Sequence, residues 1–328
     1  MKQKSLEKAI IAIRKQHILV LGDLMLDKFI YGNVQRISPE APVPVVQVTS
    51  EQAYPGGAAN VARNLSDFSA RVTVSGILGN DNNGAIVKEK LHQSNISTSC
   101  ILELPDFSTI VKTRIIARHQ QVVRVDREQR RSLTRFEKYQ LLPLIRSILP
   151  DLSAIIIEDY GKGFISQSLI NSIVDLAGQY RILISVDPNP QNPLKWQGVD
   201  IVKPNRNEAF AALGRPYSET HEDLIKAGQE LLDRWKISHL LITLGEEGMA
   251  LFRPGTDPYF SPTRAQEVFD VSGAGDTVIA FFTAAMAAGI AAEQSAEIAN
   301  HAAGVVVGKL GTATLSADEL KKSFEDHE

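Results

Sequence analysis

Short continuous apolar runs alternate with longer amphipathic segments along most of the chain. Residues 17–22 and 72–78 form two such runs, and further runs begin at Ala154, Ile182, Val199 and Leu240. Runs of this kind are typical of strands buried on both faces of a parallel sheet. Between them, apolar residues recur at helical spacing over residues 134–149, 167–177, 223–235 and 292–307. The pattern predicts a three-layer α/β fold, in which helices cover both faces of a mostly parallel central sheet.

Two extended stretches interrupt this alternation. The first covers about residues 28–50 and contains prolines, which are typical of edge strands. The second covers about residues 108–126, where polar and apolar residues alternate. We expect both to form a small sheet inserted into a single domain that spans residues 1–328. Such a sheet could act as a lid over a site, or could join a second copy edge to edge in a homodimer.

The composition describes a soluble globular protein. The chain has 328 residues, of which 44% are hydrophobic and 22% are charged. A net charge of −3 argues against a nucleic-acid partner or an anionic membrane surface. Cys100 is the only cysteine, which excludes an intrachain disulfide and predicts a cytoplasmic location. The most apolar run, residues 278–292, is too short to span a bilayer and predicts a buried helix.

A turn of small residues before this apolar helix is the motif with the clearest chemistry. Gly273, Ala274 and Gly275 leave no bulk at the start of a helix expected over residues 274–288, so a ligand can approach the backbone. Free N–H groups at a helix start favour an anion, and Asp276 places a carboxylate beside them. This arrangement suits a general base next to a phosphoryl group. It equally suits an aspartate that only complements the helix dipole.

Other polar groups follow the first strand or open a helix. Asp23 and Asp27 lie at the carboxyl end of the first strand, where open α/β sheets bind ligands, and are candidates for holding sugar hydroxyls. Turn chemistry explains Asp23 equally well. Gly56 and Gly57 form a turn before a helix that carries Asn60, whose amide can both donate to and accept from hydroxyls. An ordinary helix start with a surface asparagine gives the same pattern.

Three basic residues alternate along the second extended stretch. Side chains two residues apart share one face of a strand, so Lys112, Arg114 and Arg118 could converge on one anion. A substrate phosphate is one interpretation of this stripe. A solvated face of the small sheet is the other.

Asn205 and Glu208 lie three residues apart at a predicted helix start. Their spacing suits a capping box, in which each side chain binds the backbone of the other. It also places an amide and a carboxylate on one helical face, where they could hold a hydrated Mg²⁺ near phosphates. Both interpretations stay open at this point.

Three of these motifs occur in an order that is characteristic of one enzyme family. Over nearly its whole length the chain resembles the ribokinase-like, or phosphofructokinase-B type, carbohydrate kinases. The resemblance rests on Gly56-Gly57 with Asn60, on Asn205 with Glu208, and on the segment from Asp270 to Asp276. A closer resemblance, to the D-glycero-β-D-manno-heptose 7-phosphate kinases of bacterial ADP-heptose synthesis, rests on residues 22–27, 36–46, 159–162 and 304–311.

The resemblance implies a reaction and its cofactors. The γ-phosphate of ATP would pass to the anomeric hydroxyl of the heptose 7-phosphate, giving the 1,7-bisphosphate, with ATP and Mg²⁺ as cofactors. Asp276 would be the general base, and the backbone N–H groups of Gly273, Ala274 and Gly275 would stabilise the transferring phosphoryl group.

The same resemblance implies the binding residues. Mg²⁺, held through water, and the phosphates would contact Asn205 and Glu208. Adenine would lie between the turn at Gly245 and Gly248 and the helix near Asn300, and the carbonyls of Asp270 and Val271 would hold K⁺. The sugar hydroxyls would contact Asp23, Asp27, Gly56, Gly57 and Asn60. The substrate phosphate would contact some of Lys112, Arg114, Arg118 and Lys162.

Other functional classes make different predictions. A sugar-binding regulator on a kinase fold would not need Asp276, and ATP turnover would exclude it. A nucleotidyltransferase that activates a sugar is expected to carry a His-x-Gly-His motif, which this sequence lacks. Among the kinases, a different sugar phosphate or a nucleoside remains the alternative substrate.

Overall fold

The computed structural model describes residues 1–328 apart from residues 2, 118–119, 266–267, 310, 312 and 326–328. Within this described part, nine strands form the central sheet in the order β13-β12-β11-β10-β9-β8-β1-β4-β5. In chain order these strands are β1 (His17–Gly22), β4 (Arg71–Gly79), β5 (Ser97–Leu104), β8 (Ala154–Glu158), β9 (Leu183–Asp187), β10 (Ile201–Val202), β11 (His239–Thr243), β12 (Met249–Phe252) and β13 (Tyr259–Ser261).

The central sheet is mostly parallel, as its continuous apolar runs predict. All pairs from β5 across to β11 are parallel, and only β12 and β13 add antiparallel pairs at one edge. Successive side chains of a strand point to opposite faces, so Ile18 and Val20 pack into one hydrophobic core and Leu19 and Leu21 into another. A strand whose side chains pack into a core on each face must be apolar at every position. This accounts for the continuous apolar run of β1, without alternating polar residues.

Helices cover both faces of the sheet, which confirms the predicted three layers. One layer consists of α1 (Gln3–Arg14), α2 (Ala58–Asp67), α3 (Asn82–Gln93), α8 (Ala274–Ala287), α9 (Ala292–Val307) and α10 (Ala317–Glu325). The other consists of α4 (Arg135–Ile148), α5 (Gln167–Gly178), α6 (Arg206–Ala212) and α7 (His221–Trp235). The described part of the chain also contains two short 3₁₀ turns, η1 (Leu149–Asp151) and η2 (Gly245–Glu247). Among the described residues, no helix is both long and apolar enough to cross a membrane.

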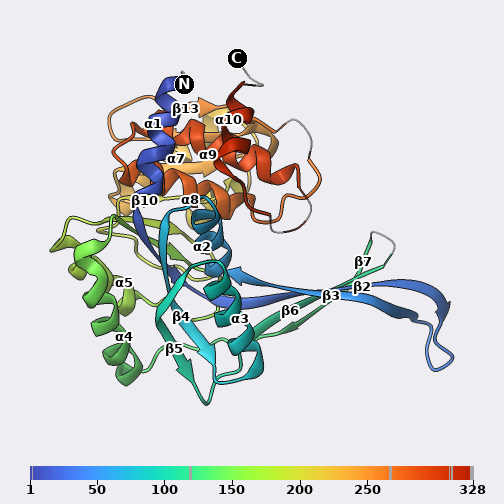
Figure 1. Cartoon of the computed structure of the whole chain (residues 1–328). Helices are drawn as coiled ribbons and strands as arrows, with labels where there is room; N and C mark the ends of the chain where they lie inside the picture. The colour runs from blue at the N-terminus through green and yellow to red at the C-terminus, as the bar shows by residue number, and fades with distance from the viewer. Residues whose placement is uncertain (2, 118–119, 266–267, 310, 312, 326–328) are drawn as a thin grey trace.

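A second sheet stands out from one side of the main body (Figure 1). Its order is β3-β2-β6-β7, formed by β2 (Leu24–Ile37), β3 (Pro44–Gly57), β6 (Ile110–Ala117) and β7 (Gln120–Arg127). The predicted small sheet therefore exists, but its first two strands extend beyond the expected range of residues 28–50. The reason is that the chain leaves the main sheet directly after β1 and continues as β2, which pairs with β3 along its full length.

This pairing also corrects the expected turn at Gly56 and Gly57. Both residues belong to β3, where Met25 pairs with Gly56 and Leu24 with Gly57. A Cβ atom on Gly56 would collide with the carboxylate of Asp27, and a Cβ on Gly57 would collide with the carbonyl of Asp23. The helix α2 begins only afterwards, at Ala58. These glycines thus allow β3 to approach β2 closely beside the start of α2.

Candidate active site

Two cavities meet at the start of α8, at the carboxyl edge of the parallel strands. One, here called the acidic cavity, has a volume of about 350 Å³ and is lined by residues that include Glu158, Tyr160, Asp187, Lys203, Asn205, Glu208 and Asp276. The other, here called the apolar cavity, has a volume of about 480 Å³. Both include Thr243 and Gly275 in their linings, so a single elongated ligand could occupy the two cavities together.

The first turn of α8 is built from residues without bulk. Gly273 lies at the N-cap in the left-handed conformation, with φ of 82°. A side chain there would be strained, and its Cβ would lie 2.9 Å from Nδ2 of Asn60. Gly275 faces Lys203, whose Nζ would lie 3.3 Å from a Cβ at that position. The predicted anion site therefore has a helix start, a neighbouring ammonium group and room for a ligand.

Asp276 lies in this first turn with a hydrogen bond to each carboxylate oxygen. Asn60 Nδ2 donates to Oδ2 at 2.7 Å, and the Tyr160 hydroxyl donates to Oδ1 at 2.8 Å. Burial raises the pKa of Asp276 to about 6, while the two hydrogen bonds oppose that rise and the charge of Asp187 adds to it. A carboxylate with such a pKa is mostly ionised at neutral pH and can still accept a proton, as a general base must.

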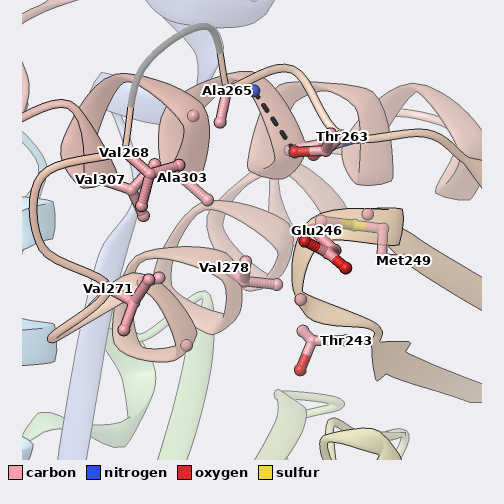
Figure 2. A pocket seen from close by; sticks show the side chains of 16 residues that line it. Thr243, Glu246, Met249, Thr263, Ala265, Val268, Val271, Val278, Ala303 and Val307 are labelled. Atoms are coloured by element: carbon pink, nitrogen blue, oxygen red, sulfur yellow. Dashed lines mark hydrogen bonds between the residues drawn. The ribbon is translucent and has the colours of Figure 1, made fainter.

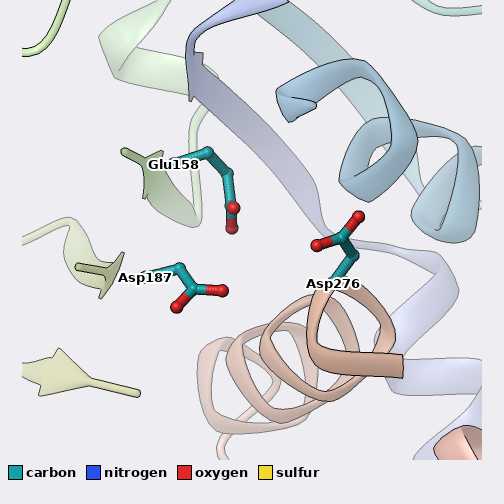
Figure 3. A group of neighbouring side chains, drawn as sticks. All are labelled: Glu158, Asp187 and Asp276. Carbon is teal, nitrogen blue, oxygen red and sulfur yellow. The ribbon is translucent and has the colours of Figure 1, made fainter. Parts of the chain in front are cut away.

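Two further carboxyl groups face Asp276 across the acidic cavity (Figure 3). Oxygens of Glu158, Asp187 and Asp276 lie within 4.8 Å of one another. Burial, followed by the charges of Asp187 and Asp276, raises the pKa of Glu158 well above its ordinary value. Burial also raises the pKa of Asp187 to about 6. The cluster therefore carries less negative charge at neutral pH than three ordinary carboxylates would.

Lys203 supplies a positive charge to this cluster. Its Nζ lies 2.8 Å from Asp187 Oδ2, and its side chain is only 4% exposed. Burial alone would lower the pKa of Lys203, but the attraction of Asp187 and Glu158 raises it. The ammonium group is therefore charged in the acidic cavity, close to Gly275 and to the anion site of α8.

Asp23 organises the loop after β8 in this structure. Its carboxylate is buried and accepts backbone N–H groups from Tyr160 at 3.1 Å, Lys162 at 3.0 Å and Phe164 at 3.3 Å. Burial raises the pKa of Asp23, and these three hydrogen bonds partly offset the rise. Both oxygens are thus used for the backbone. These contacts join Asp23 to a distant loop and are not the local turn contacts that the sequence suggested, and a contact between Asp23 and a sugar stays a prediction.

Asn205 and Glu208 form a capping box at the start of α6. Glu208 N donates to Asn205 Oδ1 at 2.9 Å, and Asn205 N donates to Glu208 Oε2 at 2.7 Å. Both residues also line the acidic cavity, so the two interpretations of their spacing are compatible. Within the described structure the capping bonds use only one carboxylate oxygen of Glu208, which leaves Oε1 for a hydrated cation.

Two of the predicted phosphate-binding cations already pair with carboxylates. Arg114 Nη1 lies 2.5 Å from Asp27 Oδ1, and its guanidinium stacks over Phe29, with Cζ 5.2 Å from the ring centroid. Lys162 Nζ lies 2.6 Å from Glu128 Oε2. Burial, then repulsion by Lys162, lowers the pKa of Lys112. Arg118 lies outside the described residues.

The apolar cavity lies between the 243–249 segment and helices α8 and α9 (Figure 2). Valines at 268, 271, 278 and 307 form much of its wall. Gly245 and Gly248 line it, both with positive φ, and a Cβ on Gly248 would collide with the backbone of Ser261. Asn300 also lines the cavity, and its Nδ2 donates to Ser261 Oγ at 2.8 Å and to the Pro262 carbonyl at 2.7 Å.

Asp270 and Val271 lie in the loop before α8. The Asp270 carboxylate accepts N–H groups from Ser272 at 2.9 Å and from Gly311 at 3.2 Å. The Val271 carbonyl accepts the N–H of Ala274 at 3.2 Å. A K⁺ ion at the predicted position would therefore share a carbonyl that already closes the turn into α8.

The residues of the acidic cavity that the sequence did not assign include Glu158, Tyr160, Asp187 and Lys203. Each lies at, or one or two residues beyond, the carboxyl end of β8, β9 or β10. Polar residues at such strand ends gather at one edge of a parallel sheet, and this rule could have identified them. It could not have indicated which of them contact Asp276, because those contacts depend on rotamers and on the loop that Asp23 holds.

Comparison with known proteins identifies the family. A family model described as "pfkB family carbohydrate kinase" matches residues 15–319. This match extends from β1 to the last helix and includes every motif of the two cavities. The chain belongs to the pfkB family of carbohydrate kinases, and it is an ATP-dependent sugar kinase.

Curated relatives are similar over nearly the whole chain. "Bifunctional protein HldE" of Geobacter sulfurreducens is 40% identical over 99% of this chain and 66% of its own length. Proteins with the same name are 41% identical in Pelobacter propionicus, over 98% of this chain and 65% of theirs, and 39% identical in Yersinia enterocolitica, over 95% and 64%. This chain therefore spans less than two thirds of the length of these relatives.

Solved structures share the fold at low sequence identity. Phosphofructokinase-2 from Escherichia coli in complex with potassium superposes with a TM-score of 0.76 at 20% identity, over 95% of this chain and 98% of that one. Ribokinase from Arabidopsis thaliana, complexed with ribose and ATP, superposes with a TM-score of 0.75 at 19% identity, over 95% of this chain and 99% of that one. The ribokinase-like fold expected from the sequence is thus confirmed.

Proposed function

We propose that this kinase transfers the γ-phosphate of ATP to the anomeric hydroxyl of D-glycero-β-D-manno-heptose 7-phosphate. The product would be the 1,7-bisphosphate, a precursor of ADP-heptose and the lipopolysaccharide core. The observation that carries the proposal is the position of Asp276, a carboxylate held by two donors where the two cavities meet. The choice of sugar is supported by the HldE relatives and by the segments that resemble heptose 7-phosphate kinases.

Asp276 would take the proton of the attacking hydroxyl. Its pKa of about 6 leaves it mostly ionised at neutral pH, so it is available as a base without a preceding proton loss. The N–H groups of Gly273, Ala274 and Gly275 would stabilise the charge on the transferring phosphoryl group, with Lys203 beside them. A donor of this kind typically lowers the barrier by about 3 kcal/mol, or roughly 10²-fold in rate.

The two cavities have the chemistry that ATP and Mg²⁺ require. The apolar cavity, with Gly245, Gly248 and Asn300 in its wall, suits an adenine ring, and the start of α8 suits the phosphates. Glu208, with Asn205 beside it, would hold Mg²⁺ through water. When bound, Mg²⁺ neutralises charge on the phosphates. We further propose K⁺ at the carbonyls of Asp270 and Val271.

The sugar would lie between the acidic cavity and the small sheet, which would act as its lid. Asn60 is well placed to bind a hydroxyl, because its Oδ1 is buried with no hydrogen-bond partner among the described residues. The sugar hydroxyls would also contact Asp23, Asp27, Gly56 and Gly57, which lie around the start of α2.

Among the cations, Lys112 is the strongest candidate to hold the sugar phosphate. No carboxylate lies within ion-pair distance of its Nζ in the described structure, whereas Arg114 and Lys162 already have partners. A phosphate would also offset the burial and the repulsion by Lys162 that disfavour its charge. Arg114, Arg118 and Lys162 would assist.

We also propose a cytoplasmic homodimer that forms through the small sheet.

A coupled ADP-release assay tests the reaction, the substrate and the base together. The wild-type protein should turn over D-glycero-β-D-manno-heptose 7-phosphate strongly and fructose 6-phosphate, ribose and adenosine weakly. Asp276→Asn should lower kcat on the heptose phosphate by orders of magnitude while ATP binding, measured by calorimetry, stays nearly unchanged. Strong turnover of another sugar would leave the kinase mechanism intact but contradict the heptose assignment. A near-normal kcat in Asp276→Asn would contradict the assignment of Asp276 as the general base.

A further inference from the structure

Tyr160 reaches from the loop after β8 to the carboxylate of Asp276. Its hydroxyl donates to Oδ1 at 2.8 Å, while Asn60 of α2 donates to Oδ2 at 2.7 Å. The two donors come from separate elements, so together they fix the plane of the carboxylate. Each carboxylate oxygen has about two lone-pair sites, so each keeps one for the proton of a substrate hydroxyl.

Tyr160 remains a donor at all pH values at which a kinase would work. Burial raises the pKa of its phenol well above the ordinary value, and the negative charges of Asp276, Glu158 and Asp187 raise it further. The phenol therefore keeps its proton, and the carboxylate of Asp276 is the acceptor. Because an ionised carboxylate only accepts hydrogen bonds, the phenol keeps this contact only as the donor.

The backbone that carries Tyr160 is fixed independently of Asp276. The N–H groups of Tyr160, Lys162 and Phe164 all donate to the buried carboxylate of Asp23. Asp159, the preceding residue, accepts from Gly161 N and from Asn192 Nδ2, each at 2.8 Å. The position of the phenol is thus set by the loop, which allows it to orient the aspartate.

The groups around Asp276 shift its pKa in opposite directions. Glu158 faces it from β8, Asp187 from β9, and Lys203 from the segment after β10. Burial raises its pKa most and Asp187 raises it further, whereas the bonds from Asn60 and Tyr160 and the charge of Lys203 lower it. Loss of the phenol would remove one of the three opposing influences and favour the protonated form, which cannot act as a base.

We propose that Tyr160 is a positioning residue for phosphoryl transfer, which holds Asp276 ionised and directed toward the acceptor hydroxyl. The inference rests on the proposed role of Asp276 as the base and adds a second residue to that role. It assigns Tyr160 no contact with the substrate. A purely structural role would instead predict that loss of the phenol affects folding but not the pH dependence of the reaction.

The pH profile of kcat for Tyr160→Phe tests the proposal. A hydrogen bond to a charged group corresponds to about one pH unit or more, so the acid limb should move upward by about one unit. Near pH 6 kcat should fall about fivefold, and near pH 8.5 it should stay within about twofold of wild type, with KM for ATP unchanged. Ionisation of the substrate phosphates is common to both proteins, so a difference between the profiles belongs to the enzyme.

Tyr259→Phe is the matched control. The Tyr259 hydroxyl also donates to a carboxylate, Glu297 Oε1 at 3.2 Å, but it lies on β13 and lines neither cavity. Its profile should coincide with that of the wild type. A loss of kcat in Tyr160→Phe that is equal at all pH values, or an unmoved acid limb, would overturn the proposal.

A second variant keeps the test decisive if Tyr160→Phe does not fold. Replacing Tyr160 with 3-fluorotyrosine preserves the ring and strengthens the donor, so the acid limb should move to lower pH. No movement would again overturn the proposal. Asp276→Asn, assayed in parallel, separates the two failures. If it keeps its activity, the base assignment fails and the inference with it. If it is inactive while both Tyr160 variants follow the wild-type profile, only the inference fails.

Discussion

At Asp276 the requirements of folding and of chemistry oppose each other. Burial raises its pKa to about 6 from an ordinary value of 3.8, so the folded protein binds this proton more tightly than the unfolded chain does. Stability from such a group is greatest when the carboxyl is protonated. It declines as pH rises from about 4 through 6, because ionisation then favours the unfolded state. Above pH 6 the folded protein keeps an ionised carboxylate at a cost in free energy.

Asp276→Asn should therefore stabilise the protein while it removes activity. At about pH 8 the free energy of unfolding should rise by roughly 1–3 kcal/mol, a range that allows for water reaching this half-buried group. The Tyr160 hydroxyl can turn to accept from the new amide. The gain should shrink as pH falls below 6 and vanish near 4. Urea unfolding at several pH values measures it, with the exposed Asp233→Asn as the control. A variant less stable than wild type at pH 8 would contradict this account.

At the scale of elements, the loop after β8 depends on one side chain from the segment between β1 and β2. Asp23 accepts three N–H groups of this loop, which fixes the backbone of Tyr160 and Lys162. The hydrogen bond from Tyr160 N to Asp23 joins parts of the chain that are 137 residues apart. The same contact that stabilises the loop thus also sets the geometry around Asp276.

Asp23→Asn should loosen this loop. The new amide turns one acceptor into a donor that faces backbone N–H groups, and a buried unsatisfied donor costs about 1–3 kcal/mol. The melting temperature should fall, and kcat should drop most on the acid limb, because the loosened loop weakens the hydrogen bond from Tyr160 to Asp276. Steady-state kinetics over the pH range checks this. A selective rise in KM for the sugar, with unchanged stability, would instead support the direct sugar contact that the sequence allowed.

At the scale of the whole molecule, the small sheet lies apart from the main body (Figure 1). Every residue of β7 is exposed, with Val123 at 44% and Val125 at 54%. The strand order leaves β7 and β3 as the sheet edges. Unpaired edges with exposed valines favour association with another strand, and a second copy of this chain offers the same edges.

Val123→Asp should shift the proposed dimer toward a monomer. A charge on the exposed strand opposes edge-to-edge pairing, so the mass from analytical ultracentrifugation at micromolar concentration should halve. Phe136→Asp, at an exposed position of α4 in the main body, is the control and should leave the mass unchanged. A wild-type protein that sediments as a monomer, or a Val123→Asp variant that stays dimeric, would contradict the proposal.

The layers of this fold follow from local pattern alone. Continuous apolar runs predicted β1 at residues 17–22 and the parallel sheet, and helical spacing predicted α9 at residues 292–307, because burial on one or both faces leaves a period in the sequence. Pattern reasoning did not find that β2 and β3 extend to Leu24 and Gly57. That register depends on which strand pairs with which, and the sequence of one strand does not encode its partner.

The sequence by itself determined the family, the helix start at Gly273 and the carboxylate at Asp276. Small residues and an acid at fixed spacing are local properties, and local backbone geometry is enough to make them meaningful. Only the tertiary structure decided that Tyr160 and Asn60 hold that carboxylate, that Asp23 is used by the backbone, and that Lys203 pairs with Asp187. Those contacts join residues far apart in the chain, and the pKa values that make the site reactive arise from their burial together.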